Sequence, residues 1–318
     1  PALSRTGAVI TAPVRDKAWG EAWQGGDVEP EEGSESVGDD RVVVAVDAED
    51  TPWCSTGVEL VSDRLFSLGA SAVSELARDG GRLRLVADLP ALALDQLDGP
   101  YEVLEQDPSW NDAWRDHATA VAVGDRLLLR PEWVTADPAD AGRVEIVLDA
   151  THAFGSGSHP TTRLCLEVLE GLGAELAGAR VLDVGSGTGV LGVAALVLGA
   201  GSLVAVDVDP AAVAATGRTA ELNGVSDRVV EVSSRTVAEV TADHGAFDVV
   251  LANLLIPIIE TLGPELAAAV APGGHLVLSG LLADPSLGQV DRALAAIGVR
   301  LGASNELERD GWAAVATV

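Results

Sequence analysis

Basic residues are scarce in this chain of 318 residues, in which Lys17 is the single lysine. Twenty Lys and Arg stand against 49 Asp and Glu, which leaves a formal net charge of −29. Such a charge repels phosphate backbones and anionic lipid and attracts basic partners. The composition therefore predicts a protein that makes no direct contact with nucleic acid.

Cysteines and long apolar runs are equally few. Cys54 and Cys165 are too few for a disulfide scaffold and lack the spacing of metal ligands, so we expect reduced thiols and no metal site. The apolar stretch from Val190 to Ala200 contains glycines and is far shorter than the roughly 20 residues of a membrane span. The first residues lack the basic-then-apolar order of a secretory signal, so we expect a cytoplasmic protein without a membrane segment.

The chain divides by composition into four predicted parts. Residues 27–40 hold seven acidic residues and no basic one, so residues 1–40 are predicted to form an acidic flexible tail. Residues 41–106, with RVVVAV, SAVSEL and RLRLVADL, predict a small ferredoxin-like α+β domain. Residues 107–143 are predicted to form a connector with a hinge. Residues 144–318 alternate apolar strands with helical stretches, which is typical of a parallel sheet covered on both faces.

Seven strands are predicted in the last part of the chain. They are ARVLDVG, SLVAVDV, RVVEVSS, FDVVLAN, GHLVLSG, a weaker piece near residues 297–301, and WAAVATV. The last two are separated by the polar stretch SNELERDG, which is predicted to be a loop, so we expect them to form an antiparallel edge hairpin. The expected fold class is α/β, with a seven-stranded doubly wound Rossmann-like domain beside the smaller N-terminal domain.

A glycine-rich turn follows the first of these strands in VLDVGSGTGVL. Gly185, Gly187 and Gly189 allow a ligand to approach the backbone, and the start of the next helix favours an anionic group. The spacing from Gly187 through Gly189 to Gly192 also fits the G-x-G-x-x-G pattern of nicotinamide enzymes. A dinucleotide and an empty structural turn therefore stay open as alternatives.

Acidic residues at two strand ends favour one of these interpretations. Asp207 lies at the tip of the second strand, where a carboxylate can hold ribose hydroxyls in either class of cofactor. Asp183 lies inside the end of the first strand, two residues before the first glycine. An acid there, followed by G-x-G-x-G, is the pattern of S-adenosylmethionine-dependent methyltransferases, in which it supports the turn and the methionine amino group.

Five segments together carry a more specific resemblance. They are AFGSGSHPTT at Ala153–Thr162, then Asp183–Gly189, Asp207–Pro210, Asn223–Arg228 and Ala252–Leu254. In this order they resemble the PrmA family, the methyltransferases of ribosomal protein L11. The resemblance runs from about Trp110 to the C-terminus, whereas the small domain matches only in element order. NLLIPII, which begins at the Asn of the last segment, replaces the family's N-I-L-A-G-P-L, and the acidic tail has no counterpart.

The resemblance implies a set of residues for the methyl donor. Thr162, Gly185, Asp207 and Asn253 would contact S-adenosylmethionine or frame its methyl group. Asp183, Gly187 and Gly189 would shape the turn, and Phe154 would cover the donor like a lid. Thr162 could instead be a simple helix N-cap, and Phe154 could instead pack at the domain junction.

Asn253 and Leu254 are the expected catalytic residues. A lysine amine has a pKa of about 10.4, so it must lose a proton before it accepts a methyl group. The Asn253 side-chain oxygen and the Leu254 carbonyl are expected to orient the neutral amine. No general base stands out, because His152 and His159 are expected to organise the loop that they bracket.

The function that the resemblance implies is a protein N-methyltransferase. It would transfer methyl groups from S-adenosylmethionine to lysine or α-amino nitrogens of ribosomal protein L11, and the small domain would recruit this substrate. The negative charge suits a basic protein partner. A methyltransferase of another protein or of a small molecule, and a non-catalytic binding domain, are the alternatives. We expect a monomer.

Overall fold

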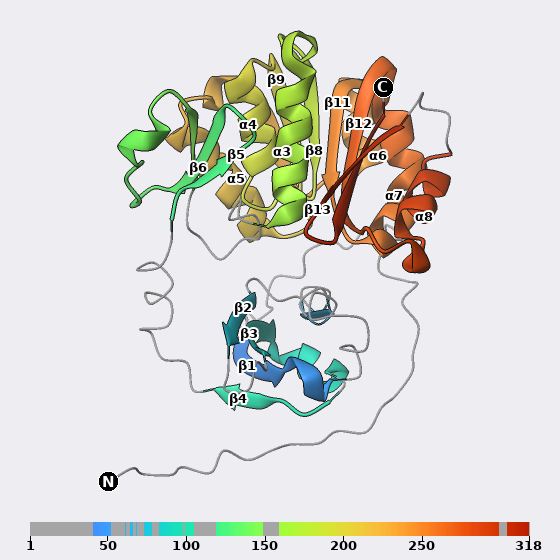
Figure 1. Cartoon of the computed structure of the whole chain (residues 1–318). Coiled ribbons are helices and arrows are strands. Elements are labelled where there is room, and N and C mark those ends of the chain that lie inside the picture. The colour runs from blue at the N-terminus through green and yellow to red at the C-terminus, as the bar shows by residue number, and fades with distance from the viewer. Residues whose placement is uncertain are drawn as a thin grey trace, which may run out of the picture. The chain divides into compact units, whose positions relative to one another are not determined.

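The structure is a computed structural model that divides the chain into two compact units, residues 1–113 and 114–318 (Figure 1). It describes residues 41–51, 61, 64–65, 68, 73–77, 83–97, 99–104, 119–148, 159–298 and 304–317. The predicted acidic tail, residues 1–40, lies outside the described residues. In the described part of the chain, no helix is long and apolar enough to cross a membrane.

The first unit contains a four-stranded antiparallel sheet. Its strands are β1 (Arg41–Asp47), β2 (Val73–Ala77), β3 (Leu83–Pro90) and β4 (Glu102–Leu104), in the order β4-β1-β3-β2. Alternate side chains of β1 and β3, among them Val44, Val46, Leu85 and Leu89, fill one apolar core. The four strands lie where the sequence predicts strands, and the ferredoxin-like assignment of residues 41–106 stays a prediction.

The second unit is built on a seven-stranded sheet. Its strands are β8 (Arg180–Val184), β9 (Ser202–Val206), β10 (Val229–Ser233), β11 (Phe247–Asn253), β12 (Val270–Leu282), β13 (Ser304–Arg309) and β14 (Trp312–Thr317). The order is β10-β9-β8-β11-β12-β14-β13, with β14 antiparallel to both of its neighbours. The chain leaves β8 toward one side and returns to the other side through β11. Open α/β sheets bind ligands at such a reversal, outside the carboxyl ends of the strands.

Helices cover both faces of this sheet, as predicted (Figure 1). One face carries α3 (Pro160–Leu172), α4 (Val190–Leu198) and α5 (Pro210–Leu222), and the other α6 (Val237–His244), α7 (Ile256–Ala269) and α8 (Gln289–Ala296). Successive strand residues alternate between the two cores, so that Val181 belongs to one apolar cluster and Leu182 to the other. Burial on both faces explains why the parallel strands are almost continuously apolar.

The final hairpin differs from the prediction in the position of one strand. β13 begins at Ser304, inside the stretch for which the sequence predicts a loop, whereas Ile297 ends helix α8 instead of opening a strand. Glu306 and Glu308 are exposed on β13. Because β13 is the edge strand of the sheet, it tolerates polar side chains that would be excluded from a central strand. The antiparallel pairing of the last two strands is confirmed.

A three-stranded sheet precedes the main sheet, and two of its strands, β5 (Val121–Val123) and β6 (Leu127–Pro131), lie in residues 107–143, for which the sequence predicts a connector. The third strand is β7 (Val144–Leu148). Leu127, Leu129 and Ile146 are buried in the same apolar cluster as α3 and α4. Residues 119–143 are therefore a folded part of the second unit, and the prediction of a connector is wrong for them.

Asn223 and Arg228, from one of the segments that carry the resemblance, hold this unit together. The Asn223 side chain accepts a hydrogen bond from Val147 N at 2.9 Å and donates one to Val147 O at 2.7 Å, which fixes β7 to the end of α5. Arg228 donates to Leu196 O at 2.7 Å and to Ala200 O at 3.1 Å, at the carboxyl end of α4. Both residues therefore have a structural role.

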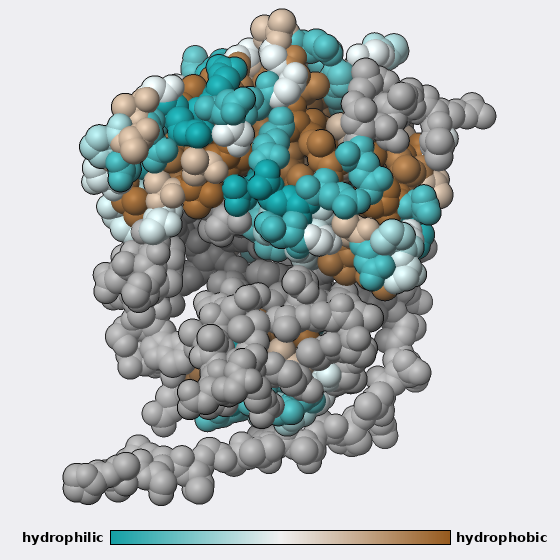
Figure 2. Space-filling view, in the orientation of Figure 1, coloured by the Kyte–Doolittle hydropathy of each residue, from teal (hydrophilic) through white to brown (hydrophobic). Residues whose placement is uncertain are grey.

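Hydrophobic and hydrophilic residues are interspersed on the visible face of the second unit (Figure 2). The large hydrophobic residues exposed in the described part of this unit are Val208, Val230, Ile258 and Leu307. Val208 follows the end of β9, and Ile258 lies in the first turn of α7, which follows β11. Two of the four therefore lie at the end of the sheet where a ligand is expected.

Candidate active site

The glycine-rich turn connects β8 to α4 at the point where the strand order reverses. Gly185, Gly187 and Gly189 have φ angles of +71°, +55° and +76°, a region that side chains rarely adopt. Gly185 N donates to Val206 O at 2.8 Å, and an added Cβ at Gly185 would lie 2.4 Å from Leu254 Cδ2. The turn is therefore held close to both neighbouring strands, and the binding of a ligand at these glycines stays a prediction.

Packing explains the other glycines of the predicted dinucleotide-like spacing. An added Cβ at Gly189 would lie 2.9 Å from Thr216 Cα, and one at Gly192 would lie 2.7 Å from Leu203 Cδ1. Gly189 thus lets α5 approach the turn, and Gly192 lets α4 approach β9. The match to G-x-G-x-x-G therefore needs no dinucleotide to explain it.

Asp183 lies under this turn and is only 1% exposed. Its Oδ2 accepts a hydrogen bond from Gly192 N at 2.9 Å, inside the first turn of α4. Burial raises the pKa of Asp183 to about 7, the Gly192 hydrogen bond opposes this shift, and the nearby charge of Asp207 adds to it. The carboxyl group is therefore close to half-protonated at neutral pH.

The raised pKa of Asp183 predicts that the contribution of this residue to the stability of the free protein falls as pH rises from about 4 to about 7. In this window the unfolded chain has lost the proton while the folded protein keeps it, so raising the pH favours unfolding. The slope should reach about 1.4 kcal/mol per pH unit. Denaturant unfolding of wild type and Asp183→Asn at pH 5, 6 and 7 measures it. A stability difference between them that stays constant with pH would contradict the prediction.

Asp207 joins the tip of β9 to the glycine turn. Its Oδ2 accepts a hydrogen bond from Gly187 N at 2.9 Å, and its Oδ1 accepts one from Asp209 N at 3.0 Å. An ionised carboxylate has about four acceptor positions, so about two remain for the hydroxyl groups of a ligand. Val208, which follows it, is 71% exposed and offers apolar surface beside these acceptors.

Thr162 is not the N-cap of α3, contrary to one of the two predicted roles. The N-cap is His159, whose Nδ1 accepts from Thr161 N, and Pro160 occupies the first helical turn. Thr162 lies within that turn, 1% exposed, and its Oγ1 has no hydrogen-bond partner among the described residues. A buried hydroxyl without a partner is costly, which makes it a candidate to bind a ligand.

Asn253 ends β11, and its side-chain amide is held by α3. Its Nδ2 donates to Thr161 Oγ1 at 3.2 Å, and Thr161 Oγ1 lies 2.7 Å from His159 Nδ1. Burial lowers the pKa of His159, so the neutral ring can accept the threonine hydrogen at Nδ1. The Thr161 oxygen then accepts from the Asn253 amide. This chain of hydrogen bonds leaves the Asn253 Oδ1 as the group available to an incoming amine.

Leu254, the other predicted catalytic residue, lies between the glycine turn and β12. Its N donates to Ser279 O at 3.1 Å, and its side chain contacts Gly185. Its carbonyl oxygen would lie 2.3 Å from a Cβ added at Gly280, so only glycine fits there. The predicted role of the Leu254 carbonyl in orienting the amine stays a prediction. Phe154 and His152 lie outside the described residues.

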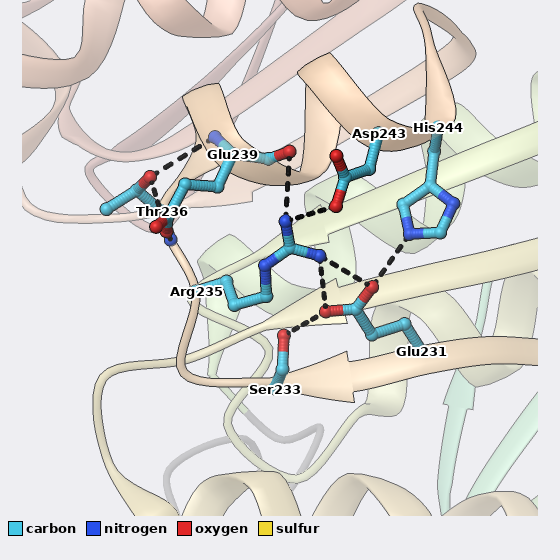
Figure 3. A network of polar contacts seen from close by, with 7 residues as sticks. All are labelled: Glu231, Ser233, Arg235, Thr236, Glu239, Asp243 and His244. Carbon is cyan, nitrogen blue, oxygen red and sulfur yellow. Dashed lines mark hydrogen bonds and ion pairs between the residues drawn. The ribbon is translucent and has the colours of Figure 1, made fainter.

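The network of polar contacts in Figure 3 has a structural role. Glu231 on β10 accepts from Ser233 Oγ at 2.6 Å and lies 2.7 Å from His244 Nε2, and these contacts, with Arg235, lower the pKa of Glu231. Thr236 and Glu239 form a capping box at the start of α6. The network fastens α6 to β10. In the described part of the chain, no three His, Cys, Asp or Glu side chains are grouped to hold a metal ion.

Three site residues escape prediction from the sequence. Thr161 stands in a segment that carries the resemblance, yet no local pattern shows that it anchors Asn253. Thr216 reaches Ser186 and Gly187 of the glycine turn from α5. Of the three, only Val208 could have been recognised from the sequence. It is an apolar residue between two acidic residues directly after a strand, which indicates an exposed position.

The strand order with antiparallel β14, the glycine turn after β8, the acid at the tip of β9 and the amide at the end of β11 define a Rossmann-like methyltransferase. A family model described as ribosomal protein L11 methyltransferase (PrmA) matches residues 84–318. The chain belongs to this family, and the predicted resemblance is confirmed. Methyltransferases of this family use S-adenosylmethionine as methyl donor, as predicted.

Individual relatives agree with the family model. A ribosomal protein L11 methyltransferase of Pelotomaculum thermopropionicum is 38% identical over 76% of this chain and 77% of its own length. The ribosomal protein L11 methyltransferase of Parasynechococcus marenigrum is 43% identical over 64% of this chain and 71% of its own length. That of Geobacter sulfurreducens is 44% identical, and the match spans only 60% of the relative's length. The crystal structure of a ribosomal protein L11 methylase from Lactobacillus delbrueckii covers 63% of this chain and 98% of its own, with 29% identity and a TM-score of 0.53.

Proposed function

We propose that this protein transfers methyl groups from S-adenosylmethionine to lysine or α-amino nitrogens of ribosomal protein L11. The relatives carry the name of this activity. The observation that carries the proposal is the position of Asn253. Its Nδ2 is held by Thr161, and its Oδ1 is therefore available at the carboxyl end of β11, next to the glycine turn.

The residues around the turn fit the methyl donor. Asp207 has acceptor positions for two ribose hydroxyls, and exposed Val208 beside it offers an apolar surface for the adenine ring. The unpartnered hydroxyl of Thr162 gains a hydrogen bond from a polar group of the donor. Asp183, which is about half-protonated near neutral pH without ligand, is available in its charged form to stabilise a cationic amino group. Once bound, the donor supplies a methyl group on a positively charged sulfur.

The acceptor side requires alignment more than acid–base chemistry. The Asn253 Oδ1 and the Leu254 carbonyl accept hydrogen bonds from a neutral amine and thereby orient its lone pair. Holding the two reactants in line can contribute about 7 to 11 kcal/mol, so no covalent intermediate with the protein is needed. The apolar Leu254 side chain, which lies on Gly185, excludes water from the same place.

Charge supports a basic protein as the acceptor. The net charge of −29 attracts a ribosomal protein in its free state and repels RNA. We infer that the first unit recruits this substrate and that the enzyme acts as a monomer in the cytoplasm. The proposal is tested by incubating the protein with labelled S-adenosylmethionine and purified L11, followed by identification of the labelled residue. Donor binding without transfer would support a non-catalytic binding domain instead.

Asp207→Ala is expected to weaken donor binding by about 1 to 3 kcal/mol, because the ribose hydroxyls lose a charged acceptor and Gly187 N loses its partner. Titration calorimetry measures this loss. Asp209→Ala is the matched control, since Asp209 caps α5 by accepting from Ala211 N and is exposed. The control should cost about 1 kcal/mol of stability and leave donor affinity unchanged. Equal affinity of folded Asp207→Ala and wild type would contradict the assigned role.

A further inference from the structure

Thr216, in the middle of α5, is buried against the glycine turn. It is 0% exposed, and its Oγ1 lies 2.9 Å from Ser186 Oγ and 3.2 Å from Gly187 O. A hydroxyl group donates one hydrogen bond. Because the Gly187 carbonyl only accepts, Thr216 donates to it, and the Ser186 hydroxyl donates to Thr216. Two consecutive residues of the turn are thus tied to one side chain of α5.

The peptide groups of Gly187 are held from two sides by the same stretch of chain. Its N–H donates to Asp207 Oδ2 at 2.9 Å, and its C=O accepts from Thr216. Asp207 lies just before α5, and Thr216 lies in the second turn of this helix. Gly187 has a φ of +55°, and glycine loses more conformational freedom on folding than any other residue. The two contacts therefore hold in place a turn that would otherwise be free to change shape.

Close packing adds a third contact to the same side chain. Cβ atoms added at Gly189 would lie 2.8 Å from Thr216 Cγ2 and 2.9 Å from Thr216 Cα, so the turn rests directly on the helix. A displacement of α5 would therefore be transmitted to the turn through both packing and hydrogen bonds.

We propose that Thr216 is a positioning residue for the methyl donor. It acts through Ser186 and Gly187 and keeps the turn in the shape that binds the donor. This proposal rests on the proposed function, because it requires that the glycine turn binds S-adenosylmethionine. It predicts that the Thr216 hydroxyl sets donor affinity, while the rate at donor saturation depends on Asn253 and is nearly unaffected.

The chain offers a matched control on the same helix. Thr219 lies one turn further along α5, is also 0% exposed, and its Oγ1 has no hydrogen-bond partner among the described residues. Threonine and valine have nearly the same shape, so Thr216→Val and Thr219→Val each replace one buried hydroxyl group by a methyl group and remove its hydrogen-bonding capacity. Only the first substitution removes hydrogen bonds to the turn.

The experiment compares wild type, Thr216→Val, Thr216→Ser and Thr219→Val in the full chain. Calorimetry gives the Kd for S-adenosylmethionine, and steady-state assays on L11 give KM and kcat. We expect Thr216→Val to raise Kd and the donor KM about tenfold, with kcat at donor saturation within about twofold. Thr216→Ser, which keeps the hydroxyl, should restore Kd to within about twofold of wild type. Thr219→Val should bind the donor like wild type.

Ser186→Ala removes the other partner of the hydrogen bond to Thr216 and provides a second test if Thr216→Val does not fold. It should weaken donor binding by several-fold, because the hydrogen-bond chain loses its first donor. Wild-type affinity in folded Thr216→Val or Ser186→Ala would overturn the proposal, as would failure of folded Thr216→Ser to restore it. If wild type itself does not bind S-adenosylmethionine, the proposed function fails, which is a separate result.

Discussion

A protein shortened to residues 114–318 is expected to bind S-adenosylmethionine as tightly as the full chain and to lose most of its methylation of L11. Every residue proposed to bind the donor that the structure describes, from Thr162 to Asn253, belongs to this second unit. Recruitment of the protein substrate by the first unit would be lost. Because linked binding sites raise apparent affinity by about 100-fold or more, kcat/KM for L11 should fall by a similar factor.

The position of the cut decides whether this experiment is informative. A cut at residue 145 would remove β5 and β6 and leave Ile146 and Leu148 without the apolar partners that bury them. We expect that shorter form to lose stability, whereas the form that begins at 114 should melt as a cooperative unit. Steady-state assays of the 114–318 form and the full chain at equal donor saturation provide the comparison. Undiminished turnover on L11 would contradict recruitment by the first unit and favour a small-molecule acceptor.

Short apolar runs, and the residue types at the ends of these runs, allowed most of the second unit to be predicted. The parallel strands are apolar at almost every position because helices bury both faces, and this pattern is visible in the sequence. β13 could not be recognised in the same way. An edge strand with Glu306 and Glu308 exposed has the composition of a loop, and only its pairing with β14 shows that it is a strand.

The small sheet of β5, β6 and β7 was missed for a related reason. The stretch that contains it precedes the first strand of the main sheet, and a short three-stranded sheet has no periodic pattern long enough to separate it from a linker. Its burial depends on α3 and α4, which come later in the chain. The side chain of Asn223, 76 residues away, completes the attachment by pairing with Val147. A contact between residues so far apart in the chain cannot be recognised from the local sequence.

The residues of the candidate site likewise fall into two groups, those that the local sequence identifies and those that it does not. Asp183, the glycines and Asp207 are set by local geometry at strand ends, so their residue types and spacing identify them. The residues that hold the site in shape come from elsewhere in the chain: Thr161 reaches Asn253 across 92 positions and Thr216 reaches Ser186 across 30. A sequence therefore indicates which groups meet a ligand more readily than which groups position them.

Asn253→Ala is expected to reduce kcat on L11 by about 100-fold or more, while the Kd for S-adenosylmethionine rises by less than about tenfold. In the proposed mechanism Asn253 Oδ1 accepts from the amine as it approaches the methyl group, and removing one such preorganised polar contact typically costs a factor of about 100 to 1,000 in rate. Rapid-quench measurement of a single turnover, with donor and L11 saturating, reports this step. A near wild-type rate in a folded Asn253→Ala variant would exclude Asn253 from the catalytic step.

Thr161→Val tests how much the orientation of the Asn253 amide, as distinct from its presence, contributes to kcat. The variant keeps Asn253 but removes the oxygen that accepts from its Nδ2, so the amide is free to turn its NH2 group toward the amine. An amide in that orientation offers a donor where an acceptor is needed. We therefore expect kcat to fall about tenfold, less than for Asn253→Ala, because the correct orientation is still populated. If Thr161→Val and Asn253→Ala are combined, the loss should equal that of Asn253→Ala alone, since Thr161 acts through the amide. Additive losses would show that Thr161 contributes to the rate by another route.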